Sequence, residues 1–304
     1  MSQPIVTSDF AIGMFPVVEK WTGIGYNEPD LVHPIVYKKK DSTRNAEVYA
    51  GHTGLGLAVK KGEGENITFE SMKQGHILHV RPDTYAIGFA CSREEIEDNM
   101  YKEVITRRSE ELGRSARASK ETLSANVFNN GFDSSYTYGS GKEAFADDIP
   151  YMDGDGTWAN EPSVAADLTE ASLEQAFIDI RGYRDEGHKL AMIRPKNVVV
   201  PPELQFDIAR ILESKERPGT ANNDTNALRD YKAYKDYIIW DYLTDPDAWF
   251  IVTDSPSGFE WVNRRDNEIA SDTSFTSEDL RYKLSFRVAF SLSDHRGGYG
   301  SPGA

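Results

Sequence analysis

Residues 92–129 carry the pattern of one long amphipathic helix, which constrains the fold more than any other feature of the chain. Ser92 and Glu95 form a capping box, in which each side chain can bond the backbone amide of the other residue. Apolar residues follow at helical spacing, namely Ile96, Met100, Val104, Ile105, Leu112, Ala116, Leu123 and Val127. If unbroken, with Gly113 as its weakest point, the helix is about 57 Å long. It predicts an elongated body with the helix as its strut.

The segments before this helix contain apolar residues but lack a core of their own. Residues 1–34 carry Phe10, Phe15 and Trp21 among glycines and prolines, and we expect an irregular arm there. Residues 35–90 show strand-like runs around a glycine-rich polar tip, which predicts a long two-stranded excursion. A two-stranded hairpin is marginally stable by itself. We therefore expect both segments to lie along another surface, in the same chain or in a neighbouring copy.

The remainder of the chain predicts a mixed α+β body. Residues 131–168 are rich in glycine and aspartate and are expected to form loops. One helix is expected between Thr169 and Gly182, and another from Pro201-Pro202 onward. Strands are expected near 198–200, 237–240, 249–252 and 259–262, and over 282–292, where apolar and polar residues alternate. The glycines from 297 onward predict a flexible tail.

The charge distribution argues against several classes of function. The formal net charge is −15, and residues 131–180 contain eleven acidic side chains and one basic one, Lys142. A groove that grips nucleic acid needs clustered lysine and arginine, so tight DNA binding is not expected. An acidic surface can instead lie near DNA without adhering to it.

No apolar run approaches the roughly 20 residues of a membrane span. We expect no secretory signal in the start MSQPIVTSDF, and a single cysteine, Cys91, excludes an intrachain disulfide.

The glycine-rich loops do not have the spacing of known ligand-binding loops. Gly141-Lys142 resembles the end of a phosphate-binding loop, but Tyr136 and Glu143 occupy positions that require glycine and serine or threonine. The segment 51–56 lacks the glycine order of a dinucleotide-binding turn. The segment that starts at 153 departs from a calcium loop at several ligand positions. Each of these loops is expected to be a surface turn.

The candidate ligands and nucleophiles are also incomplete. His76 and His79 have no second pair of ligands to complete a tetrahedral metal site. Cys91 lacks a thiol-protease signature, and a lone cysteine is usually a small core residue. The pair Asp147-Asp148 is unremarkable in so acidic a chain. The sequence therefore predicts no catalytic residue, no metal site and no cofactor.

Six segments of the chain match a known family in the same order. They are 93–101 (REEIEDNMY), 171–182 (ASLEQAFIDIRG), 193–206 (IRPKNVVVPPELQF), 220–228 (TANNDTNAL), 242–250 (YLTDPDAWF) and 294–304 (DHRGGYGSPGA). This ordered set resembles the major capsid proteins of tailed phages related to the Mu-like major head subunit family. The resemblance extends from about residue 50 to the end. One departure is Asp148-Ile149-Pro150, where relatives often have histidine before proline.

The resemblance implies the Hong Kong 97 capsid fold, an α+β fold with named parts. Residues 1–34 would be the N-terminal arm and 35–90 the extended loop. Residues 91–164 and 256–304 would form the peripheral domain, with its spine helix at about 92–129. Residues 165–255 would form the axial domain.

The function implied by the resemblance is structural. Copies of the chain would assemble as hexamers and pentamers into an icosahedral shell around a double-stranded DNA genome, with a triangulation number of seven as the expectation from size. Implied partners are scaffolding, portal and decoration proteins, with packaged DNA nearby but no sequence-specific DNA binding and no membrane. The location would be the virion, and the host cytoplasm during assembly. We name as candidate assembly contacts Phe15, Trp21, Gly54, Gly56, Lys60, Lys61, Arg107, Arg108, Asn222 and Asn223.

Two alternatives remain open from the sequence. An encapsulin-like shell protein of a cellular nanocompartment would share the fold and enclose protein cargo. An acidic hydrolase would use a carboxylate pair such as Asp147 and Asp148.

Overall fold

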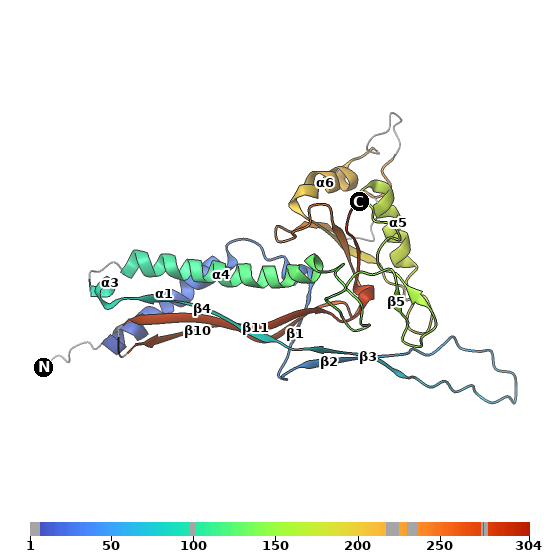
Figure 1. Cartoon of the computed structure of the whole chain (residues 1–304), viewed down its shortest axis with the longest axis horizontal. Coiled ribbons are helices and arrows are strands. Elements are labelled where there is room, and N and C mark those ends of the chain that lie inside the picture. The colour runs from blue at the N-terminus through green and yellow to red at the C-terminus, as the bar shows by residue number, and fades with distance from the viewer. Residues whose placement is uncertain are drawn as a thin grey trace.

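The chain forms an elongated body, a compact body that rises from one end of it, and a hairpin that projects past the compact body (Figure 1). The structure is a computed structural model and describes residues 7–97, 101–216, 225–229, 231, 236–274, 276 and 279–304.

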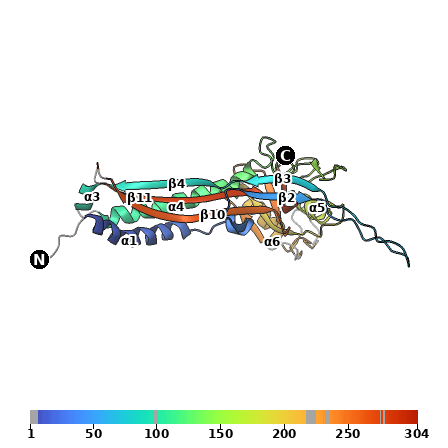
Figure 2. The same cartoon turned by 90° about the horizontal axis from the view of Figure 1, so that it is seen from below.

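The elongated body is a four-stranded sheet with α4 (Tyr101–Asn129) along one face and α1 (Thr7–Asn27) beside its β10 edge (Figures 1 and 2). Its strands lie in the order β1 (Lys38–Asp41), β10 (Phe259–Thr273), β11 (Leu280–Leu292) and β4 (Asp83–Cys91). The β1–β10 pair is parallel and the other two pairs are antiparallel. The predicted alternation over 282–292 is confirmed, because Tyr282, Leu284, Phe286 and Val288 are buried and Arg281 and Lys283 are exposed.

The predicted spine helix is present as α3 (Arg93–Glu97) and α4 (Tyr101–Asn129), and residues 98–100 lie outside the described part. The predicted capping box is confirmed. The Glu95 amide donates to Ser92 Oγ at 3.2 Å, and the Ser92 amide donates to Glu95 Oε2 at 3.2 Å. The α4 helix continues through Gly113, which the sequence suggested as its weakest point.

The N-terminal segment corrects the prediction of an irregular arm. Residues Thr7–Asn27 form helix α1, which packs against α4 despite Pro16 within it. At Gly25 a Cβ atom would lie 2.2 Å from the Glu110 carbonyl oxygen, and at Gly113 it would lie 2.2 Å from the Thr22 carbonyl oxygen. The glycines that suggested breaks thus permit two helix backbones to touch. A short helix, α2 (His33–Val36), then leads into β1.

The compact body contains the second four-stranded sheet and two helices. Its strand order is β12 (Gly298–Ser301), β9 (Trp249–Thr253), β7 (Pro195–Val200) and β8 (Asp236–Ile239). The helices are α5 (Glu170–Arg181), which Thr169 caps as predicted, and α6 (Gln205–Glu213), preceded by a 3₁₀ turn η1 (Pro202–Leu204). Residues 131–168 are mostly loop, with the short pair β5 (Ile149–Pro150) and β6 (Thr157–Trp158).

The C-terminal segment corrects the prediction of a flexible tail, because its last residues are part of a strand. After the 3₁₀ turn η2 (His295–Gly297), strand β12 pairs with β9 of the compact body, and Tyr299 is buried against Trp249. Pairing with β9 satisfies backbone groups that a glycine-rich tail would otherwise expose to water.

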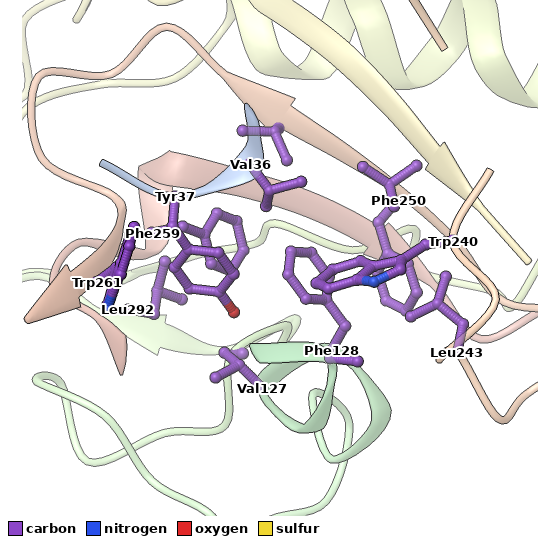
Figure 3. Packing of buried hydrophobic residues seen from close by; sticks show 14 of the residues in the cluster. Val36, Tyr37, Val127, Phe128, Trp240, Leu243, Phe250, Phe259, Trp261 and Leu292 are labelled. Carbon is purple, nitrogen blue, oxygen red and sulfur yellow. The ribbon is translucent and has the colours of Figure 1, made fainter. Parts of the chain in front are cut away.

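An aromatic cluster joins the two bodies where α4 ends (Figure 3). Phe128 stacks on Phe259 of the elongated sheet at a ring-centroid distance of 4.5 Å, and its ring lies 5.2 Å from that of Phe250 and 5.5 Å from that of Trp240. Because one side chain of α4 contacts strands and turns of both bodies, the end of the spine helix fixes how the bodies meet.

A buried carboxylate lies beside this cluster. Glu121 of α4 is almost fully buried, and its Oε1 accepts hydrogen bonds from the Val32 amide at 3.1 Å and from His33 Nδ1 at 2.8 Å. Its Oε2 accepts from Trp240 Nε1 at 3.0 Å. The burial of Glu121 acts to raise its pKa, but the hydrogen bonds from His33 and Val32 outweigh it and hold the pKa below the usual range.

Candidate assembly surfaces

The projecting hairpin has a paired base and an unpaired tip. Strands β2 (Glu47–His52) and β3 (Gln74–Val80) pair in register from Glu47 opposite Val80 to His52 opposite Gln74. Thr53 and Lys73 continue the contact, since the Thr53 amide donates to the Lys73 carbonyl at 2.9 Å. Of the segment 35–90 predicted as an extended loop, β1 and β4 pair within the elongated sheet, and the part between them projects.

The tip of this hairpin exposes large apolar side chains. Phe69 is 90% exposed, Leu57 77% and Val59 71%. Leu55, Ile67 and Met72 are also exposed. Covering such a side chain contributes about 1.5–3 kcal/mol. The sequence prediction named the glycines and lysines of the tip but missed these residues, although the alternation of Leu55, Leu57 and Val59 was a readable signal.

Four predicted contacts lie on this hairpin. Lys60 and Lys61 are exposed near its far end. The Gly56 amide donates to Glu70 Oε2 at 2.6 Å and so links the two arms. Gly54 lies beside Gly187, in the loop that follows α5. The structure thus brings Gly54 against the compact body and leaves the two lysines free of it.

Two predicted contacts, Phe15 and Trp21, lie on α1 and are half-buried. Phe15 packs at the margin of a small core that contains Met14, Val18 and Ile105. This small core therefore buries part of the apolar surface of α1. Val17 of the same helix is not buried by it and remains 43% exposed.

The remaining predicted contacts differ in their surroundings. Arg107 is exposed on α4. Arg108 donates to Glu95 Oε1 at 2.9 Å and to the Ala90 carbonyl at 2.9 Å, so it ties α3 and the end of β4 to α4. These hydrogen bonds from Arg108 lower the pKa of Glu95. Asn222 and Asn223 lie outside the described residues.

The acidic loops do not form a recognisable catalytic site. Asp147 and Asp148 are exposed, and Asp148 is paired with Lys142. Burial, reinforced by Asp147 and Glu143, raises the pKa of Glu161 to about 7. This arrangement concentrates negative charge on one surface but offers no enclosed pair of carboxylates, so the geometry does not support the acidic hydrolase alternative.

The candidate metal ligands are likewise separate. His76 and His79 lie on β3, His76 half-buried and His79 exposed. Within the ranges that the structure describes, no three histidine, cysteine or acidic side chains are placed to hold a metal ion. Nor does any described helix carry an apolar stretch long enough to cross a bilayer.

The fold defines a class of protein. A long helix on a narrow sheet, a compact body at one end and a projecting hairpin make up the Hong Kong 97-like fold of viral shell subunits. The virus-like particle from Pyrococcus furiosus matches with a TM-score of 0.55 and 9% identity, over 94% of this chain and 98% of that one. The procapsid of bacteriophage JBD30 matches with a TM-score of 0.55 and 14% identity, over 98% and 76%. Mycobacterium phage Patience matches with a TM-score of 0.54 and 11% identity, over 99% and 89%.

The sequence narrows this class to a family. The chain belongs to the phage capsid protein family, whose pattern matches residues 77–301. A comparison with curated proteins found no match. It is thus a structural capsid shell protein, and its place in the virion is the capsid. The predicted resemblance and fold class are confirmed.

Proposed function

We propose that this chain is the major head subunit of a tailed phage and assembles as hexamers and pentamers into an icosahedral shell around double-stranded DNA. The observation that carries the proposal is the hairpin tip, where the apolar side chains of Leu57, Val59 and Phe69 are exposed in the described part of the chain. In this assignment the elongated body is the peripheral domain, the compact body the axial domain and the hairpin the extended loop.

The proposal extends to partners and location. Assembly would take place in the host cytoplasm with a scaffolding protein and a portal, and decoration proteins could bind the finished shell. The net charge of −15 supports a surface that lies near packaged DNA without sequence-specific binding. The aromatic junction at Phe128 supports a subunit whose two bodies keep one relative orientation.

The experiment that tests the proposal removes the apolar tip without touching the core. We expect a variant with Leu57→Ser, Val59→Ser and Phe69→Ser to fold with the melting temperature of the parent protein and to form no normal particles in electron micrographs. The matched control replaces exposed apolar residues elsewhere, Val164→Ser and Met192→Ser, which are 77% and 80% exposed. Intact particles from the tip variant, or a parent protein that stays a monomer at high concentration with scaffold supplied, would contradict the proposal.

A second candidate is the encapsulin-like shell of a cellular nanocompartment, because a virus-like particle from a cellular organism, Pyrococcus furiosus, matches this chain over 94% of its length. The family match over residues 77–301 favours the phage head. The contents of purified particles distinguish the two, since a phage head holds a genome and a nanocompartment holds protein cargo.

A further inference from the structure

The turn between β5 and β6 carries Met152 and lies next to the base of the projecting hairpin (Figure 1). The Tyr151 amide donates to the Gly156 carbonyl at 3.2 Å, and the Gly154 amide donates to the Tyr151 carbonyl at 3.0 Å. Gly154 and Gly156 have φ angles of 83° and 85°, which glycine adopts more readily than any other residue. The backbone that presents Met152 is therefore held in one tight turn.

Polar contacts tie this turn to the loop that follows α5. The Met152 amide donates to Glu186 Oε2 at 2.8 Å, and a hydrogen bond joins His188 Nε2 to Asp153 Oδ2 at 2.9 Å. Glu186 Oε1 also forms an ion pair with Arg296 Nη2 at 2.6 Å, and both of these side chains are largely buried. Met152 is thus anchored to the compact body through Glu186.

The hairpin receives the Met152 side chain at two positions that have no side chain of their own. A Cβ atom on Gly51 of β2 would lie 2.1 Å from Met152 Cε. One on Gly75 of β3 would lie 2.2 Å from Met152 Sδ and 2.7 Å from its Cγ. Neither glycine has a positive φ, so the strand backbone does not itself require glycine here. The two glycines form a cradle across both strands, and the unbranched, adaptable methionine side chain fills it.

The root of the hairpin is a separate point of attachment. Only Arg81 and Pro82 stand between β3 and β4 of the elongated sheet, and Arg287 Nε donates to the Pro82 carbonyl at 2.9 Å. A lever that is held only at its root can pivot, whereas a second contact further along fixes its direction. The contact of Met152 with Gly51 and Gly75 is placed to be this second contact.

The length of the hairpin makes its direction sensitive to this contact. Figure 1 shows the part that follows β2 projecting past the compact body. A strand rises about 3.3 Å per residue, so the chain from residue 55 to residue 63 forms a lever about 30 Å long. A rotation of about 10° at the base would move the far end by about 5 Å.

We propose that Met152 clips the base of the hairpin to the compact body and so sets the direction in which the hairpin projects. Loss of the clip would leave both bodies folded and allow the hairpin to pivot about its root. The inference deepens the proposed function, on which its consequence rests, because assembly through the hairpin tip requires tips that are held in one place.

Distances between two spin labels in the unassembled protein test the clip. In a Cys91→Ala background, Lys61→Cys near the far end of the hairpin and Arg107→Cys on α4 carry the labels, and both positions are exposed. We expect one narrow distance distribution in this background. In Met152→Ala and in Gly75→Ala the distribution should shift or broaden by about 5 Å or more.

The matched control is Gly54→Ala on the same hairpin, where a Cβ meets its nearest atom at 3.6 Å, an ordinary contact. It should keep the narrow distribution. Melting temperatures show that each variant is folded. If Gly75→Ala does not fold, Met152→Ala carries the test, because it removes atoms that line an open cavity of about 400 Å³.

The same distance distribution in Met152→Ala as in its background would overturn the clip, even in a protein that forms normal particles. Broadening in Gly54→Ala equal to that in Gly75→Ala would also overturn it. Failure of the parent protein to form particles would instead contradict the proposed function, and the distances would still decide whether Met152 directs the hairpin.

Discussion

At the scale of single residues, Glu121 is the side chain on which most separate parts of the chain converge. It accepts hydrogen bonds from His33, from the Val32 amide and from Trp240 while almost fully buried. We expect Glu121→Ala to lower the free energy of unfolding by about 3–5 kcal/mol, because the donors would remain buried without an acceptor. Denaturant unfolding of the unassembled protein measures this. Glu111→Ala is the control, since Glu111 is exposed on the same helix and its ion pair with Arg114 at 3.6 Å should contribute about 1 kcal/mol or less.

The same residue predicts a pH dependence. Because the pKa of Glu121 is lower in the folded protein than in the unfolded chain, its stabilisation is complete above the unfolded value of about 4.3 and is lost as the pH falls through the folded value. In Glu121→Gln, the free energy of unfolding should therefore fall less steeply with acid below that pH than in the parent protein. Parallel acid unfolding curves for the two proteins would show that other carboxylates carry the effect.

At the scale of elements, the contact between α1 and α4 depends on glycine. In an isolated helix Gly113→Ala would be favourable by about 1 kcal/mol, but here the new Cβ would lie 2.2 Å from the Thr22 carbonyl oxygen and push α1 away. We expect a net loss of about 1–3 kcal/mol in the free energy of unfolding. The control is Gly23→Ala on α1, where a Cβ meets nothing within 4 Å, so this variant should be neutral or more stable. Equal effects of the two substitutions would mean that the helices can separate freely.

At the scale of the whole molecule, the net charge of −15 opposes the association of copies. Salt screens such repulsion, with a Debye length of about 8 Å at physiological ionic strength. We therefore expect the yield of particles at fixed protein concentration to rise between roughly 20 mM and 500 mM sodium chloride. Light scattering and electron micrographs measure the yield. Particles that dissociate as salt is added would instead show that ion pairs between copies outweigh the net repulsion.

The sequence by itself determined the features that depend on neighbours a few residues apart. The capping box of Ser92 and Glu95, the end of the spine helix at Asn129 and the alternation from Tyr282 to Leu292 are all found as predicted. The Hong Kong 97-like fold class was predicted from the family resemblance of the sequence. As assembly contacts the sequence predicted glycines and lysines of the projecting hairpin and not its exposed apolar residues, because the alternation of Leu55, Leu57 and Val59 is short and lies among glycines.

Only the tertiary structure decided which of the apparently irregular segments are ordered. In the sequence Gly25 suggested an irregular arm and Gly113 a weak point of the long helix, yet both glycines permit α1 and α4 to pack backbone to backbone. The glycine-rich C-terminal segment becomes the buried strand β12 because β9 offers it a pairing edge. Val32 meets Glu121 across 89 residues of sequence. Close approach between distant segments depends on how the whole chain packs. The local residue pattern of one segment does not show which other segment its backbone will contact.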